Sequence, residues 1–125
     1  MEKVVVDSHA LFWFFTENPK LSSKARNLIQ ESNEVVVPSI VLMEILYILE
    51  KSRLSPRFVE ILSELKLRRY TIYPLDIDIV TQTLFISSRM EMHDRIIVAT
   101  AQLFDYFLIS KDPEIHKIYQ KAVWI

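Results

Sequence analysis

Apolar residues occur along the chain in short, uninterrupted runs that alternate with longer stretches of mixed polarity. The runs at residues 3–6, 34–37, 70–73 and 106–109 are rich in valine, isoleucine and aromatic residues, and a similar short run closes the sequence at 122–125. β-Branched and aromatic residues favour strands, and a continuous apolar run indicates a strand that is buried on both faces. The pattern therefore predicts a mostly parallel sheet of about five strands.

The longer stretches between these runs carry helix signals. Ser22 and Asp76 are residue types that cap helix N-termini, and Pro38 and Pro56 fit a first helical turn. The expected helices cover residues 10–15, 22–31, 38–51, 56–66, 76–88 and 94–104, with a short helical turn from 112. Strands that alternate with helices are typical of α/β folds. We expect one domain over residues 1–125, an α/β three-layer sandwich with helices on both faces of the sheet.

The composition narrows the possible chemistry. Half of the 125 residues are hydrophobic, and the chain contains no cysteine and no glycine. Without cysteine there is neither a disulfide framework nor a thiolate metal site, and without glycine there is no glycine-based phosphate loop. The formal net charge of −1 provides no overall attraction to nucleic acid. Binding to RNA would have to come from local groups of basic residues.

Nothing in the sequence indicates a secretory signal or a membrane span. The N-terminal apolar run is short and ends at Asp7. The longest apolar run, at residues 40–49, contains Glu44 and is too short to cross a bilayer. We therefore expect a soluble protein, and the lack of cysteine is compatible with the reducing cytoplasm.

Glu44 is the acidic residue that is hardest to explain as ordinary surface. The helix around it is apolar on every side, which predicts a helix that is buried nearly all round. A carboxylate in such a place has to be paired, hydrogen-bonded or bound to a cation, because burying it bare costs several kcal/mol. The sequence leaves two explanations, an ion pair with an arginine and a role in cation binding.

Three further acids have ordinary explanations when each is taken alone. Asp94 can cap a helix, Asp7 can form a turn at the end of a strand, and Asp112 before Pro113 makes a good helix start. Their joint placement changes the interpretation, because a parallel sheet can bring two strand ends and two helix starts to one edge. Carboxylates gathered there repel one another unless a cation is present, and oxygen ligands suit Mg²⁺ or Mn²⁺.

Four segments of the chain resemble the acidic motifs of PIN domains, especially those of the toxin nucleases in VapBC-type toxin–antitoxin pairs. The segments read VVDSHALFW at 5–13, PSIVLMEI at 38–45, MHDRIIVATA at 92–101 and LISKD at 108–112. Their order and spacing agree with the family over essentially the whole chain. The family often carries a glycine near the last strand, which this chain lacks, and we interpret that difference as a detail of a loop.

The resemblance implies a Mg²⁺- or Mn²⁺-dependent endoribonuclease, with a small antitoxin protein as partner and a homodimeric assembly. Asp7 and Asp94 would be the principal metal ligands, and Glu44 and Asp112 would complete the acidic pocket, directly or through water. Ser110 would support the site by hydrogen bonding. The all-apolar helix around Glu44 and the aromatic run at 12–15 could cover a partner or a second copy of the chain.

RNA approaching an acidic pocket needs basic residues at its rim. Arg95 and Lys111 each follow one of the candidate acids and could contact phosphate, although balancing the charge of the acids explains them equally well. A second basic group at residues 66–69 is explained by a solvated helix end. His9 is an unfavourable ligand for a hard cation and is expected to be structural or close to phosphate.

Two other classes of protein compete with a nuclease. A receiver-type signalling domain is also a small α/β sandwich with an acidic Mg²⁺ site, but it requires paired acids after the first strand, and Asp7 is followed by Ser8. In such a domain Asp76 would be the residue that accepts the phosphoryl group. A phosphatase with a D-x-D motif fails because His9 takes the second position. A PIN-like binding module without catalytic activity remains open.

Overall fold

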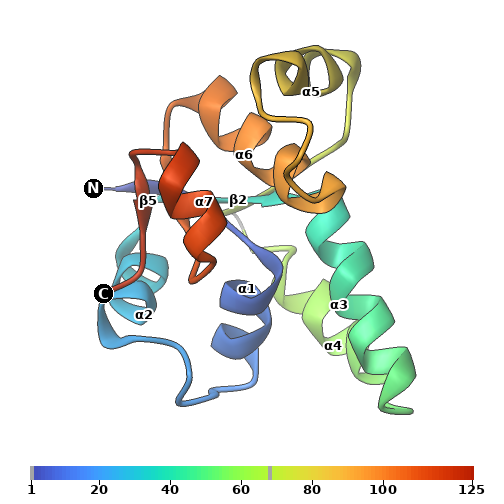
Figure 1. The fold of residues 1–125 in the computed structure, drawn as a ribbon. Helices are drawn as coiled ribbons and strands as arrows, with labels where there is room; N and C mark the ends of the chain where they lie inside the picture. Colours follow the sequence, from blue (N-terminus) through green and yellow to red (C-terminus); the bar gives the residue numbers. More distant parts are fainter. Residues whose placement is uncertain (1, 68) are drawn as a thin grey trace.

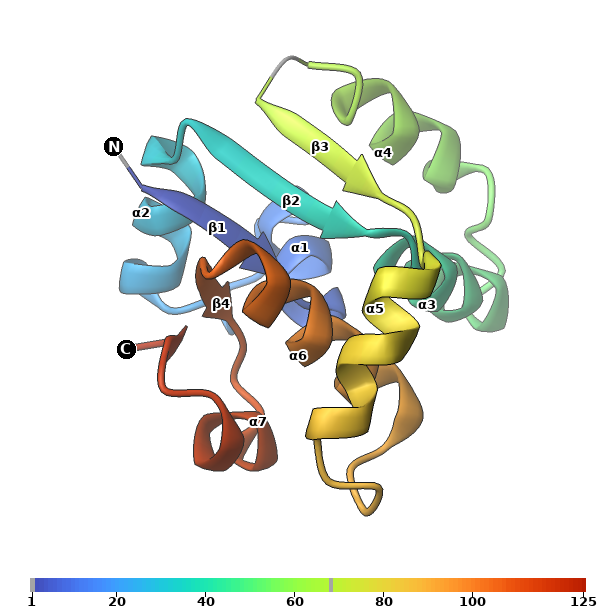
Figure 2. The same ribbon diagram turned by 90° about the horizontal axis from the view of Figure 1, so that it is seen from above.

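The computed structural model describes residues 2–67 and 69–125. Within these ranges, five strands form one sheet in the order β3-β2-β1-β4-β5, and each neighbouring pair is parallel. The strands are β1 (Lys3–Val6), β2 (Glu34–Pro38), β3 (Tyr70–Tyr73), β4 (Phe107–Ile109) and β5 (Ala122–Val123). Figure 2 shows β1, β2 and β3 side by side and pointing the same way. The predicted parallel sheet of five strands is confirmed.

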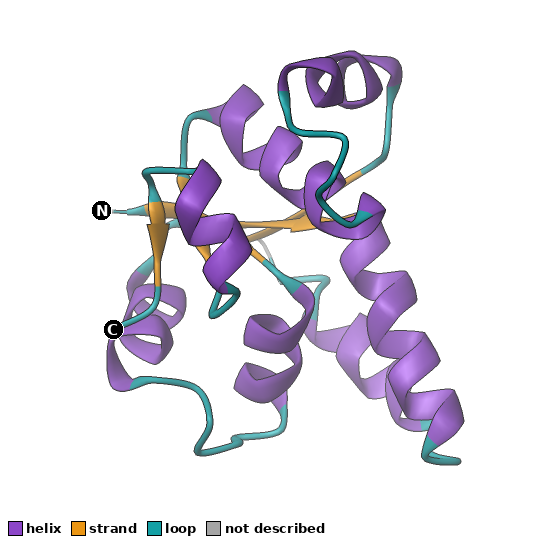
Figure 3. Ribbon diagram, in the orientation of Figure 1, coloured by secondary structure: helices purple, strands orange, loops and turns teal. Residues whose placement is uncertain are grey.

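Helices cover both faces of this sheet, as predicted for a three-layer sandwich. They are α1 (Ser8–Phe15), α2 (Ser23–Glu31), α3 (Ser39–Lys51), α4 (Arg57–Glu64), α5 (Ile77–Gln82), α6 (Met92–Phe104) and α7 (Pro113–Ile118), with the 3₁₀ helix η1 (Thr83–Phe85) after α5. In Figures 1 and 3 the sheet lies between α5 and α6 above and α1 and α2 below. None of the helices in the described ranges is both long and apolar enough to cross a membrane.

The order of the strands determines where a ligand can bind. The chain adds β2 and β3 on one side of β1 and then crosses over to add β4 and β5 on the other side. The strand order therefore reverses between β1 and β4, and ligands of open α/β sheets bind outside the carboxyl ends of the strands at such a point. Val6 and Ile109, the last residues of these two strands, are paired. Asp7 and Ser110 follow them directly at the same edge of the sheet.

The centre of the core combines the valine runs of β1 and β2 with the middle of α6. Residues 4–6 of β1 and 35–37 of β2 are fully buried, and residues 97–101 of α6 are almost completely so. Strands that are covered on both faces need apolar residues at successive positions, which is why these runs do not alternate in polarity. Burial of this central part holds the carboxyl ends of β1 and β4 in fixed positions.

Several helix boundaries differ from those predicted. Pro38 ends β2 and precedes the first residue of α3, where it was expected inside the helix. The helix after Asp76 ends at Gln82 and continues as η1, six residues short of the predicted end at residue 88. α6 begins at Met92 with Glu91 as its N-cap, so the prediction that Asp94 opens this helix is wrong.

The prediction that the helix around Glu44 is buried nearly all round is also wrong. Only Val41, Ile45 and Leu49 of α3 are buried. They are four residues apart and therefore form one stripe along the helix. Met43 and Tyr47, on another side, are 60% and 61% exposed. In Figure 1 the far end of α3 extends away from the sheet.

A chain without glycine has to use other residues in the left-handed backbone region. Glu17, Arg53 and Asp105 have φ values of 53°, 58° and 57°. Arg53 follows the end of α3, where its N–H bonds to the Glu50 carbonyl and the next N–H bonds back to Leu49. These two bonds form a Schellman motif, whose left-handed position strongly favours glycine.

We expect Arg53→Gly to raise the free energy of unfolding by about 0.5–1 kcal/mol, because glycine adopts this conformation without strain from a Cβ atom. The matched control is Ser52→Gly, whose backbone has an ordinary φ of −92°. We expect that variant to be less stable than the wild type. Urea denaturation of both variants measures the difference, and a destabilised Arg53→Gly would contradict the motif.

Candidate active site

A cleft of about 550 Å³ opens at the carboxyl ends of β1 and β4. Its lining comes from four separate segments: the end of β1 with α1, the middle of α3, the N-cap and first half of α6, and the loop from β4 to the first residue of α7. The lining residues are Asp7, Ser8, His9, Trp13, Glu44, Glu91, Asp94, Ile97, Lys111, Asp112 and Pro113. All four candidate acids from the sequence therefore line one cleft, at the point where the strand order reverses.

Asp7 joins the end of β1 to the start of α1. Its Oδ1 accepts a hydrogen bond of 2.9 Å from the Ala10 N–H, so the residue caps α1. The side chain is only 7% exposed. Burial raises the pKa of Asp7 and the charge of Asp112 adds to the rise, while hydrogen bonds from Ser110 and Ala10 oppose it. The capping role that the sequence suggested and a place in the cleft thus coexist in one residue.

Asp94 lies in the first turn of α6 and faces other acids. Burial is the main cause that raises its pKa to about 7, and contact with the Asp112 carboxyl is the second. The charges of Glu91 and Glu44 add to the effect. Like charges held this close disfavour ionisation, so Asp94 binds a proton more readily than an ordinary aspartate unless a cation is present.

Glu44 reaches the cleft from α3 and is oriented by two neighbours. Ser8 donates a hydrogen bond to its Oε1, and its Oε2 lies 3.5 Å from Nδ1 of His93. Its side chain is 30% exposed, so it faces the cleft and not a closed core. Among the ion pairs of residues 2–67 and 69–125, Glu44 pairs with this histidine and with no arginine. Among the described residues, which do not include Arg68, the alternative of an arginine partner is therefore not found.

Ser110 is fully buried where β4 ends. Its hydroxyl accepts a hydrogen bond of 3.1 Å from the Asp112 N–H and also bonds to the Asp7 side chain. Asp112 uses Oδ1 to accept the Glu114 N–H at 2.8 Å and so caps α7. Ser110 thereby links the two acids that follow β1 and β4.

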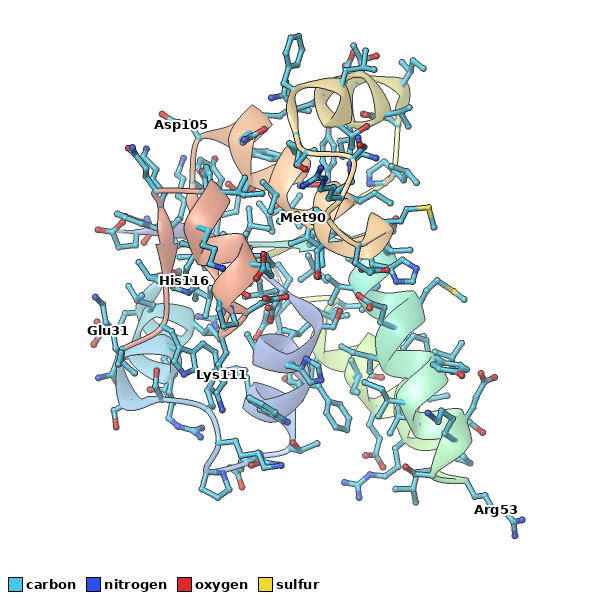
Figure 4. The ribbon with its side chains drawn as sticks, in the orientation of Figure 1. Glu31, Arg53, Met90, Asp105, Lys111 and His116 are labelled. Carbon is cyan, nitrogen blue, oxygen red and sulfur yellow. The ribbon has the colours of Figure 1, made fainter. Side chains whose placement is uncertain are left out.

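The two basic residues suggested by the sequence differ in position. Lys111, which is labelled in Figure 4, lines the cleft. Its Nζ lies 5.9 Å from the ring centroid of Trp13. Arg95 points to η1 instead, where its guanidinium donates to the carbonyl oxygens of Thr83 at 2.8 Å and Ile86 at 3.4 Å. The structure therefore brings only Lys111 to the acids. Of the basic group at 66–69, Arg68 lies outside the described residues.

Glu91 and His93 belong to the site and were missed in the sequence. Glu91 lines the cleft, and its Oε2 accepts a hydrogen bond of 3.1 Å from the Asp94 N–H. Nδ1 of His93 lies 3.1 Å from Oε1 of Glu91. The sequence signal for Glu91 was its spacing from Asp94. An acid three residues before another can cap a helix, and both acids then lie at the N-terminus of that helix. Glutamate is an uncommon N-cap, so its residue type gave no sign of this role.

The donor set of the cleft suits a hard cation. Five carboxylates line it, and such oxygen ligands are those that Mg²⁺ and Mn²⁺ prefer. Within the described residues no three acid or histidine side chains form a ready-made cage for an ion. Magnesium commonly binds through one or two carboxylates and keeps several waters, so the contacting pair of Asp94 and Asp112 with Asp7 nearby fits that mode.

Comparison with known proteins places the chain in a family. The family profile of the PIN domain matches residues 4–121. A toxin–antitoxin complex from Klebsiella pneumoniae is similar in structure, with a TM-score of 0.73 and 21% identity over 97% of this chain and 96% of that one. VapBC2 from Rickettsia felis, solved with a DNA fragment from its promoter, has a TM-score of 0.71 and 16% identity over 92% of each chain.

A third similar structure is Mycobacterium tuberculosis VapC20, described as a toxin that cleaves the sarcin–ricin loop. Its TM-score is 0.70 and its identity 14%, over 92% of this chain and 94% of that one. No match was found among curated protein sequences. Likeness at these identities shows a shared fold, and the family match covers nearly the whole chain. With its parallel sheet and its acids at the edge between β1 and β4, the chain belongs to the PIN domain family.

Proposed function

We propose that the protein is a divalent-metal-dependent endoribonuclease and the toxin of a toxin–antitoxin pair. The observation that carries the proposal is the convergence of Asp7, Glu44, Asp94 and Asp112 on one cleft at the switch point of the sheet. The family match and the likeness to VapC20, a sarcin–ricin loop cleaving toxin, support the choice of a nuclease that acts on RNA. A receiver domain is not supported, because Asp76 caps α5 and bonds to Tyr73 away from the cleft.

The acids of the cleft would hold Mg²⁺ or Mn²⁺, with Asp7 and Asp94 as principal ligands and Glu44 and Asp112 direct or through water. Such an ion supplies a more acidic water and neutralises charge that develops on the phosphate. Ser110 orients Asp7 and Asp112, and Ser8 and His93 orient Glu44. These contacts fix the carboxylates before substrate arrives, which reduces the reorganisation needed during reaction.

The proposal includes a small antitoxin partner and a homodimer. The similar structures from Klebsiella pneumoniae and Rickettsia felis are toxin–antitoxin complexes, which supports an antitoxin for this chain. Large apolar side chains that are more than half exposed, such as Tyr47 on α3 and Leu84 and Phe85 of η1, support contacts with another protein. We propose the cytoplasm as the place of action, where RNA is available.

The test is incubation of mixed RNA with the purified protein in Mg²⁺, in Mn²⁺ and in EDTA. We expect cleavage with either metal and none in EDTA. Asp7→Asn should be inactive yet folded, because asparagine also caps helices well. Its matched control, Asp78→Asn, changes an exposed acid of α5 and should cleave like the wild type. RNA left intact in every metal would identify a binding module without catalytic activity, and cleavage that persists in EDTA would exclude a metal-dependent site.

A further inference from the structure

His116 forms a hydrogen bond to the main chain next to the cleft. It belongs to α7, the helix that begins just after Asp112, and it is labelled in Figure 4. Its Nε2 lies 2.6 Å from the carbonyl oxygen of Ser110. A carbonyl oxygen can only accept a hydrogen bond, so the ring donates this one through Nε2. His116 therefore contacts the residue that links the two acids after β1 and β4, although it has no part in the proposed hydrolysis.

The peptide group between Ser110 and Lys111, the 110–111 peptide group, lies where the sheet ends. The Ser110 N–H still belongs to the sheet, since it donates to the Val123 carbonyl at 3.2 Å. β5 ends at Val123, and within residues 2–67 and 69–125 no main-chain hydrogen bond involves the Ser110 carbonyl or the Lys111 N–H. Ser110 is fully buried, and a buried carbonyl without a partner is costly. The His116 ring thus takes the place of a strand as the partner of this group.

The 110–111 peptide group stands between residues that carry the acidic site. On one side, the Ser110 hydroxyl bonds to the Asp7 side chain and accepts the Asp112 N–H at 3.1 Å. On the other side, Lys111 lines the cleft and leads directly to Asp112. A change in the orientation of this group would move Asp112 relative to Ser110 and weaken the bonds that hold the two acids. His116 is thus linked to both acids through one intervening residue.

We propose that His116 is a positioning residue of the acidic cleft, which fixes the orientation of the 110–111 peptide group. That orientation sets how Asp7 and Asp112 lie relative to one another. The effect on catalysis rests on the proposed function, whereas the effect on the metal-free structure does not. The contact needs an N–H at the position of Nε2, which the amide of glutamine can supply. The amide nitrogen of asparagine lies near the position of Nδ1 and is too far away.

Tyr119 offers a matched control, because it attaches the same helix to the other end of β4. It is the C-cap of α7, and its hydroxyl donates hydrogen bonds to the carbonyl oxygens of Tyr106 at 2.6 Å and Ala101 at 3.1 Å. Tyr106 precedes β4 (Phe107–Ile109), so these bonds lie away from the cleft. Tyr119→Phe loosens α7 without altering the 110–111 peptide group. A residue that only held α7 on the sheet would behave like Tyr119.

Amide NMR spectra of the metal-free protein in EDTA test the positioning role without any activity. The reporter is the Ala10 N–H, which bonds to Asp7 Oδ1 at 2.9 Å and belongs to α1, outside the altered helix. We expect its resonance to shift in His116→Ala and His116→Asn and to keep its wild-type position in His116→Gln and Tyr119→Phe. A resonance that moves equally in His116→Ala and Tyr119→Phe, or in neither, would overturn the positioning role.

Metal affinity and cleavage measure the size of the effect. A group bonded directly to a metal ligand is worth about 10- to 100-fold in affinity, so we expect His116→Ala, one residue further away, to weaken Mn²⁺ binding by about 3- to 10-fold. At saturating Mn²⁺ the kcat for RNA cleavage should fall about tenfold with KM nearly unchanged, because the acids are misplaced and not removed. His116→Gln should recover most of both losses. Tyr119→Phe should match the wild type in both measurements, although it unfolds at a lower urea concentration.

These outcomes separate the positioning role from the proposed function. If cleavage depends on metal but His116→Ala binds Mn²⁺ and cleaves RNA like the wild type, the positioning role is overturned and the nuclease stands. If no metal supports cleavage but the Ala10 resonance responds as expected, the proposed function fails and the positioning role stands. Should His116→Ala not fold, the comparison of His116→Gln with His116→Asn decides. Equal behaviour of those two variants would overturn the role of the Nε2 bond.

Discussion

Asp94→Asn is expected to reduce metal-dependent RNA cleavage by more than about 100-fold, because even groups that only orient metal ligands are worth 10- to 100-fold. The same variant should be more stable than the wild type in EDTA. Removing the charge of Asp94 relieves its repulsion with Asp112, Glu91 and Glu44. A one-unit pKa shift corresponds to about 1.4 kcal/mol, and solvent screening reduces the total here to a gain of about 1–2 kcal/mol.

This combination separates a functional acid from a structural one. An acid that only caps a helix would leave cleavage intact and lower stability when it is replaced. Initial rates with labelled RNA and urea denaturation in EDTA measure the two effects on one protein preparation. Asp78→Asn serves as the control and should change neither the rate nor, beyond a few tenths of a kcal/mol, the stability. An Asp94→Asn variant that is both active and less stable would show that Asp94 is structural.

Stability of the metal-free protein should fall as the pH rises from about 4 to about 7. The pKa of Asp94 is raised from 3.8 to about 7 in the folded protein. Between these two values the folded state holds a proton that the unfolded state has released, so the free energy of unfolding decreases with increasing pH. Thermal unfolding in EDTA at several pH values measures this slope. Asp94→Asn should flatten it, and a variant with the same slope as the wild type would contradict the assignment.

Cleavage should depend on pH in the opposite direction. A cation competes with the proton on Asp94, so at limiting Mg²⁺ the rate should fall about tenfold per pH unit below about 7. Raising the Mg²⁺ concentration should shift the midpoint to lower pH, because the ion favours the ionised carboxylates. Initial rates at two Mg²⁺ concentrations test this, and a midpoint that does not move would separate the titration from metal binding.

The strands and their order of appearance could be predicted because each depends on a local pattern. Runs such as residues 4–6 and 35–37 consist only of valine, and such runs suit strands that are covered on both faces. The exposure of Tyr47 could not be predicted, because the sequence alone does not distinguish an apolar residue that packs in the core from one on the surface. The predicted end of α5 was wrong because the chain continues as the 3₁₀ helix η1. The predicted start of α6 was wrong because Glu91, and not Asp94, is its N-cap.

The sequence predicted which acids form the candidate site but not how the side chains around them are arranged. Asp7 and Asp112 follow adjacent parallel strands, so their approach follows from topology alone. The direction of Arg95 could not be deduced, because a long side chain next to an acid can reach several partners, and here it bonds to carbonyl oxygens of Thr83 and Ile86. The contact between His9 and Trp13 follows from their spacing of four on one helix, yet nothing in the sequence shows that they face the cleft.

Direct binding of Mn²⁺ tests most sharply whether the carboxylates of the cleft share a divalent cation. The metal-free protein is titrated with Mn²⁺, and the bound ion is followed by its effect on the relaxation of water protons. We expect saturable binding that is weakened at least about tenfold in Asp7→Asn and in Asp94→Asn and is unchanged in Asp78→Asn. Absence of saturable binding, or an affinity that is the same in all four proteins, would contradict the account.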